Sequence, residues 1–309
     1  MSQNQHLNKL YLQEIHKLNE AIAYANSPVM GLTFKAIRDR LIDLKAPTDL
    51  KFKAQFRAYR RKINQIILAE FAINQELINQ EMMDKATVDA TKYSKILAKR
   101  LNQKTFVKPS PEIMKALANT LFTKPNLRFE DASINQMYKS LARGIATNAR
   151  RKVSELYMNG KTSHDISLAI AKGFGLSSAE EGLSSKAIRA RAKAFFNTSL
   201  SLVREATRAE AERAYEQYIS GWEFDAHMDG RTTIGCRGLE GHKFMKKSPN
   251  STKEGTIPPD AMVPRHFNCR SILIAIPYKH NEEWKLIDSV EYEKDGWIWA
   301  RETWKRTYK

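Results

Sequence analysis

The residues best suited to metal chemistry lie close together near the C-terminal end of the sequence. The chain has only two cysteines, Cys236 and Cys269, and His266 precedes the second by three positions. Sulfur and imidazole nitrogen are ligands that zinc prefers in proteins, and a gap of 29 residues between Cys236 and the pair at 266 and 269 is ordinary for such a site. A fourth ligand could come from Asp229 or His242. The alternative is two buried thiols beside a hydrogen-bonded histidine.

The composition indicates a basic protein made in a reducing compartment. Lys and Arg outnumber Asp and Glu by 51 to 34, which gives the 309-residue chain a formal charge of +17. A charge of this size favours a polyanionic partner such as nucleic acid, although a basic protein without any DNA role has the same composition. The sequence lacks a secretory signal at its start and any apolar run near the roughly 18 residues of a membrane span. We therefore expect no membrane partner, and cysteines that act as thiols or metal ligands rather than a structural disulfide.

Helical periodicity dominates residues 7–220, where apolar residues recur at spacings of three and four. The pattern predicts helices over about 7–25, 49–83, 88–101 and 112–122. It also predicts a helix that ends at Asn159-Gly160, a start signal at Thr162 or Ser163, and a helix of more than 30 residues over about 186–219. On this last helix we expect Arg204, Arg208 and Glu212 to lie on a solvated face opposite a core stripe.

The period changes to two at Gly221. In GWEFDAHM, residues 221–228, apolar and polar residues alternate, Asp229-Gly230 predicts a turn, and SILIAIP, residues 271–277, predicts a second strand. The predicted fold class is therefore α+β and predominantly helical, with a long helical body and a small, zinc-stabilised β-containing module. We place domains at 1–126 for docking, 127–220 for a helical middle region, and 221–309 for the module with its aromatic and basic tail.

Basic residues that could contact DNA phosphates cluster on two of the predicted helices. One cluster is interleaved with Phe52, Phe56 and Tyr59. A solvated basic face opposite a buried aromatic stripe would produce the same pattern of residues. Because nothing in either cluster resembles a base-reading element, we expect contacts to the backbone of double-stranded DNA without sequence preference. The candidate residues are Lys53, Arg57, Arg60, Arg61, Arg150 and Arg151.

The sequence lacks the motifs of several enzyme classes. The one His-x-Glu, at His280, is followed by no Cys-x-x-Cys as a nucleic-acid deaminase requires, and HExxH and GxSxG do not occur. The GKT at residues 160–162 lacks the upstream glycine of a phosphate-binding loop. We expect a protein that is not an enzyme and has no catalytic residues; the alternative is a zinc-dependent nuclease or hydrolase that acts on DNA.

The C-terminal motifs together resemble those of one protein family. Their order and approximate spacing are similar to those of phage minor head proteins of the Mu F-type head morphogenesis family, most tightly over residues 190–276. The motifs are Asp229-x-Arg231-Thr232, Cys236, Leu239-x-Gly241-x-x-Phe244 and Pro264-x-His266-x-x-Cys269-Arg270.

The resemblance implies a virion protein at the portal vertex inside the capsid, present in the host cytoplasm during assembly. Its implied partners are the portal protein and a major capsid or scaffold protein, and its implied roles are head assembly and DNA packaging, retention or ejection. Members of the family commonly read D-x-R-T-C-x-x-C and H-x-x-C-R-C, whereas this chain has Thr233 and Ser271 at two of the cysteine positions. A structural zinc held by Cys236, His266 and Cys269, and completed by Asp229 or water, is therefore the expected cofactor.

Overall fold

The computed structural model describes residues 10–18, 20, 27–44, 53–101, 103, 105–125, 132–174, 185–246, 252–266, 269–277, 282–294 and 297–308. The chain divides into two compact units. The first unit takes in Met1–Tyr24, Lys85–Leu117 and Leu200–Lys309, and the second takes in Ala25–Asp84 and Ala118–Ser199. Helices and a small antiparallel sheet confirm the predicted α+β class. The domain boundaries proposed near residues 126 and 220 stay predictions.

The second unit is helical, and its helices begin where the sequence supplies capping side chains. It contains α2 (Pro28–Ile42), α3 (Lys53–Ile73), α6 (Ile134–Met158) and α7 (Ser163–Lys172). Ser133 and Gln136 form a reciprocal capping box at the start of α6, and the Thr162 side chain accepts a hydrogen bond from the Asp165 N–H at the start of α7. The predicted end of one helix at Asn159-Gly160 and start of the next at Thr162 are thus confirmed.

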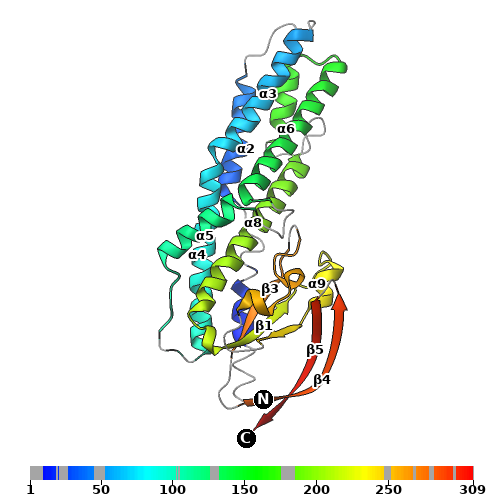
Figure 1. Cartoon of the computed structure of the whole chain (residues 1–309). Coiled ribbons are helices and arrows are strands. Elements are labelled where there is room, and N and C mark those ends of the chain that lie inside the picture. Colours follow the sequence, from blue (N-terminus) through cyan, green and yellow to red (C-terminus); the bar gives the residue numbers. More distant parts are fainter. Residues whose placement is uncertain are drawn as a thin grey trace. The chain divides into compact units, whose positions relative to one another are not determined.

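Aromatic side chains and one buried tyrosine hold these helices together. Phe34, Phe71, Tyr138 and Phe195 form a continuous series, with neighbouring ring centroids 6.2, 5.4 and 5.5 Å apart. The Tyr59 hydroxyl, buried between α3 and α7, donates to the Ser163 carbonyl oxygen at 2.6 Å. In Figure 1, α3 and α6 run side by side through this unit.

The helix predicted over 49–83 differs from the observed elements. The structure ends α3 at Ile73 and begins α4 (Gln75–Arg100) after one intervening residue, so the helix predicted over 88–101 is the second half of α4. At the break, the Asn74 side chain donates to the Glu70 carbonyl oxygen at 2.8 Å and competes with the helical ladder. Residues 49–52 of the prediction lie outside the described residues.

The sheet of the first unit confirms both predicted strands. The strand β1 (Ile219–Asp225) is central and pairs antiparallel with β2 (Lys243–Met245) on one edge and β3 (Ile272–Pro277) on the other. Trp222 and Phe224 are buried, whereas Glu223 and Asp225 between them are only partly so, as the alternating pattern predicted. The short helices α9 (Ile234–Leu239) and α10 (Lys253–Thr256) lie in the connections between strands.

The charged side chains expected on a solvated face of the long helix are buried, so that prediction was wrong. In α8 (Ser185–Arg213), Arg204 and Arg208 are each 1 % exposed and Glu212 is 3 % exposed. The spacing of apolar residues predicts only the apolar buried face of a helix. It does not predict a second buried face whose charged side chains are neutralised by partners. The Arg208 guanidinium donates to both Asp89 oxygens, at 2.5 and 2.8 Å.

Glu212 is the hub of a second buried cluster. Its carboxylate accepts hydrogen bonds from the Tyr93 hydroxyl at 2.6 Å, the Trp222 indole at 2.8 Å and the Lys253 ammonium at 3.2 Å. The ammonium also pairs with Glu205 at 3.5 Å. These contacts tie α4, α8, α10 and β1 of the first unit together.

The C-terminal tail forms a hairpin that the sequence analysis missed. The strand β4 (Glu282–Lys294) pairs antiparallel with β5 (Trp297–Tyr308), with a register shift between Leu286 and Asp288. Asp295-Gly296 between two β-rich runs was the available signal. Within the described part of the chain, none of the helices combines the length and apolar character that crossing a membrane needs.

Candidate metal centre

Two segments of the first unit bring the predicted zinc ligands together. Thr233 caps α9 and accepts a hydrogen bond from the Cys236 N–H, which places the Cys236 thiol in the first turn of that helix. Cys269 lies three residues before β3, and its N–H donates to the His266 carbonyl oxygen at 3.1 Å. The three ligand atoms lie within 4.8 Å of one another. Both cysteines are buried and His266 is partly exposed.

Hydrogen bonding distributes the protons unequally between the two thiols. A hydrogen bond from Cys269, with further bonds from Ser271, Thr233 and His266, lowers the pKa of Cys236 to about 4 despite its burial. Donating that bond and being buried raise the pKa of Cys269 well above its usual range. The lowered pKa favours the thiolate form of Cys236, which is the form that binds a metal.

The donor set fits a tetrahedral zinc ion. Zinc bonds of about 2.3 Å to sulfur and 2.1 Å to nitrogen place neighbouring ligand atoms about 3.4–3.8 Å apart. The distance from Cys236 Sγ to His266 Nε2 is 3.2 Å, and the other ligand atoms lie no more than 4.8 Å apart. Small side-chain rotations would satisfy the geometry. Two thiolates would neutralise the charge of the cation in a mostly buried site.

Asp229, the predicted fourth ligand, lies outside this group of three. The Arg270 guanidinium holds both of its carboxylate oxygens, each at 2.6 Å. The Arg231 N–H donates to the same carboxylate at 2.8 Å. These bonds, the one from Arg270 first, lower the pKa of Asp229 far below its usual range. The only group of metal-type ligands found among the described residues also leaves out His242.

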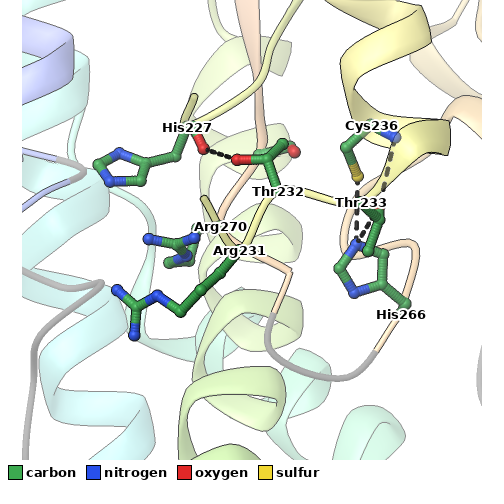
Figure 2. Close-up of a pocket in the computed structure, with 8 residues that line it drawn as sticks. His227, Arg231, Thr232, Thr233, Cys236, His266 and Arg270 are labelled. Atoms are coloured by element: carbon green, nitrogen blue, oxygen red, sulfur yellow. Dashed lines mark hydrogen bonds between the residues drawn. The ribbon is translucent and has the colours of Figure 1, made fainter. Parts of the chain in front are cut away.

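A small pocket, with about 10 Å³ of free space, opens beside the ligands. Figure 2 shows Cys236 and His266 pointing toward each other with Thr233 beside them, while His227 and the two arginines lie on the opposite side. The Thr233 hydroxyl is 3.1 Å from His266 Nε2. The lining residues are His227, Arg231, Thr232, Thr233, Cys236, His266, Arg270 and Ser271. The pocket thus has a soft, metal-binding wall and a basic wall.

The sequence singled out Thr233 and Ser271 only as positions where cysteines are missing. The structure places both against the Cys236–His266–Cys269 group, which no spacing argument had required. Sequence reasoning gave His227 no place in the site, and it named Thr232 only as part of the Asp229-x-Arg231-Thr232 motif. The available signal was their position in the turn that leads into α9.

The predicted DNA-binding residues lie on α3 and α6 of the second unit. Arg57 and Arg61 are exposed on α3, and Arg150 and Arg151 are exposed on α6. Arg60 differs from these, because its guanidinium donates to the Ser154 hydroxyl at 3.1 Å and so links the two helices. Lys53 opens α3, and its side chain is outside the described part of the structure.

A stacked aromatic pair lies between the two basic helices. The rings of Phe56 and Tyr157 stack with centroids 3.9 Å apart, and the Arg60 guanidinium lies 5.7 Å from the centre of the Phe56 ring. With the bond from Arg60 to Ser154, these contacts show that α3 and α6 are antiparallel neighbours here. The four exposed arginines therefore belong to one pair of packed helices.

The chain is a predominantly helical protein with a small antiparallel sheet, and the connections beside this sheet hold a Cys₂His group. Residues 136–274 match the model of a family described as phage Mu protein F like protein, so this stretch is similar to that family. The resemblance drawn from the motifs is therefore confirmed, and the family indicates a phage head morphogenesis protein that associates with other head proteins in the virion. The comparison with curated proteins gave no match, nor did the comparison with solved structures.

Proposed function

We propose that this chain is a minor head protein that joins the phage head at the portal vertex and is not an enzyme. It would act in capsid assembly and in DNA packaging, retention or ejection, with the portal protein and a major capsid or scaffold protein as partners. The single observation that carries the proposal is the family match over residues 136–274. The charge of +17 supports a place beside packaged DNA.

Portal association can be tested by co-expression with the portal protein of the same phage. We expect the two proteins to co-purify through an affinity tag on the portal protein and to enter one complex during size-exclusion chromatography. The major capsid protein, expressed alone with the tagged portal protein, gives the background. Elution of this chain as a separate species at concentrations where the portal assembles would contradict the proposal.

We propose that Arg57, Arg61, Arg150 and Arg151 contact DNA phosphates. All four are exposed on the packed helices α3 and α6, where guanidinium groups can reach a polyanion without unfolding any element. Such contacts release counterions, so log Kobs should fall linearly with log salt concentration, with a slope that changes by about 0.9 for each phosphate contact. Duplexes of unrelated sequence should bind equally well.

The test compares two variants with the same net charge. Replacing the four arginines with glutamine should weaken binding to a duplex and flatten the salt dependence. The matched control replaces four exposed lysines outside α3 and α6, Lys92, Lys108, Lys115 and Lys124, with glutamine. Equal slopes for the two variants would contradict a role for α3 and α6 in particular. Cleavage of the duplex by the wild-type protein with Zn²⁺ or Mg²⁺ would favour the nuclease alternative.

We propose that zinc binds to Cys236, His266 and Cys269 and stabilises the loops between the strands of the first unit. Protein purified under reducing conditions without chelator should contain close to one zinc per chain by elemental analysis. Cys269→Ser should lose the metal and lower the midpoint of thermal unfolding. His242→Ala, which removes a histidine outside the group, should keep both. Metal-free wild-type protein would contradict the assignment.

A further inference from the structure

The fourth position of the proposed zinc site cannot be filled by Asp229 without dismantling a well-formed ion pair. The two hydrogen bonds from Arg270 occupy both carboxylate oxygens at 2.6 Å, and the Arg231 N–H adds a third bond at 2.8 Å. The Arg270 side chain is only 13 % exposed, so turning Asp229 toward a metal would break a mostly buried ion pair. The aspartate therefore orders the turn and does not bind metal.

Hydroxyl groups occupy the places nearest to the three ligands. The Thr233 hydroxyl lies 3.1 Å from His266 Nε2 and accepts the Cys236 N–H at 3.3 Å. Ser271 is 4 % exposed and lines the same pocket as Cys236. Neutral hydroxyls are not among the side chains that zinc ordinarily takes as ligands, whereas both can hydrogen-bond to a molecule that is bound there.

We propose that the metal keeps an exchangeable fourth position that faces the pocket and takes water or a small inorganic anion. This inference rests on the proposed zinc site. The free space in the pocket, about 10 Å³, holds about one water molecule and so limits the ligand to a few atoms, and the guanidinium groups of Arg231 and Arg270 line its far wall. Three protein ligands with an open position distinguish this site from a closed structural site made of four side chains.

Replacement of zinc by Co²⁺ gives a direct readout, because the visible spectrum of cobalt reports its ligands. Adding azide to the cobalt-loaded wild-type protein should shift the cobalt bands with saturation. Thr233→Cys should supply a third sulfur, raise the thiolate-to-cobalt absorption about 1.5-fold, and abolish the azide response. Ser271→Cys is a second route to the same closed site if loss of the α9 cap prevents Thr233→Cys from folding. Asp229→Asn should leave the cobalt spectrum unchanged.

The neighbouring threonine provides the matched control. The Thr232 hydroxyl bonds to the His227 carbonyl oxygen and to Asp229, away from His266, so Thr232→Cys adds a thiol without a new ligand. Its azide response and absorption should match the wild type. Cobalt bound without any azide response, or an altered spectrum in Asp229→Asn, would overturn the inference while leaving the metal site intact. Protein that takes up neither cobalt nor zinc would overturn the metal site, and the inference with it.

Discussion

At the residue scale, some important side chains of the first unit could be predicted from the sequence and others could not. Cys236, His266 and Cys269 were recognisable because cysteine and histidine are rare in this chain, and the structure brings them together. Arg208 and Asp89 were not recognisable, because they lie 119 positions apart and arginine is common here. Whether a charge is solvated or paired in the interior depends on tertiary packing, which periodicity does not report.

Removal of one partner of that buried pair should be strongly destabilising. Arg208→Met leaves the Asp89 carboxylate, whose side chain is fully buried, without its two hydrogen bonds, and we expect a loss of about 3–5 kcal/mol in the free energy of unfolding by urea. Arg213→Met, on the same helix but 68 % exposed, should cost less than about 1 kcal/mol. The double variant Arg208→Met/Asp89→Leu should recover most of the loss. Equal effects of the two single variants would refute the burial argument.

Asp225 gives the first unit a distinct pH dependence. Burial raises its pKa to about 6, although His16 opposes this, and Glu240 and Glu223 add to the rise. An unfolded aspartate has a pKa of about 3.9, so the folded protein holds this proton between about pH 4 and pH 6. The folded protein is therefore stabilised in acid by the proton that it retains on Asp225, and this stabilisation is lost as the pH rises through 6.

Asp225→Asn should remove that dependence. We expect the variant to gain about 1–3 kcal/mol over the wild type at pH 7 and nothing at pH 4, measured by urea unfolding across this range. Asp260→Asn, at an exposed position of the same unit, is the control. A gain that stayed constant with pH would contradict the titration of Asp225.

At the element scale, most helices and the central strands could be predicted, whereas their breaks could not. Caps and periodicity report local preferences, which is why Thr162 and Gly160 were placed correctly. The break at Asn74 interrupts a continuous periodic pattern without a proline or glycine, so no local signal marked it. The β4–β5 hairpin was missed because the residues of β5 were described only as an aromatic and basic tail.

Two glycines associated with α6 should respond to the same substitution with opposite signs. Gly160 has a φ of 72° just after the helix, and an added Cβ would meet no atom within 4 Å, so Gly160→Ala should cost about 1 kcal/mol through backbone strain alone. Gly144 lies inside the helix, also with open space, so Gly144→Ala should stabilise by about 0.5–1 kcal/mol. Thermal unfolding midpoints that move in the same direction would contradict this account.

At the scale of the whole molecule, the family match and the compact units divide the chain differently. The matched residues 136–274 begin within α6 in the second unit and end in β3 of the first. They leave out α3, which packs against α6, and Asp89, which pairs with Arg208. The segment recognised by its sequence is therefore not a structural domain with a complete core.

A fragment of residues 136–274 should accordingly fail to fold by itself. Without Asp89 and Tyr93, the buried charges of α8 have lost two of their partners, and no apolar surface replaces them. We expect circular dichroism of the fragment to show no cooperative thermal transition, in contrast to the full chain. A sharp transition in the fragment would mean that these contacts are dispensable.

The Tyr11 hydroxyl donates to the Ala275 carbonyl oxygen in β3 across 264 positions of sequence, at 3.1 Å. During synthesis on the ribosome, every residue of the second unit emerges before that acceptor exists. The second unit can therefore fold before the strand that Tyr11 contacts has been synthesised. The sheet and its Cys₂His group are completed last, so a head protein truncated during translation would carry its basic helices but lack a closed C-terminal module.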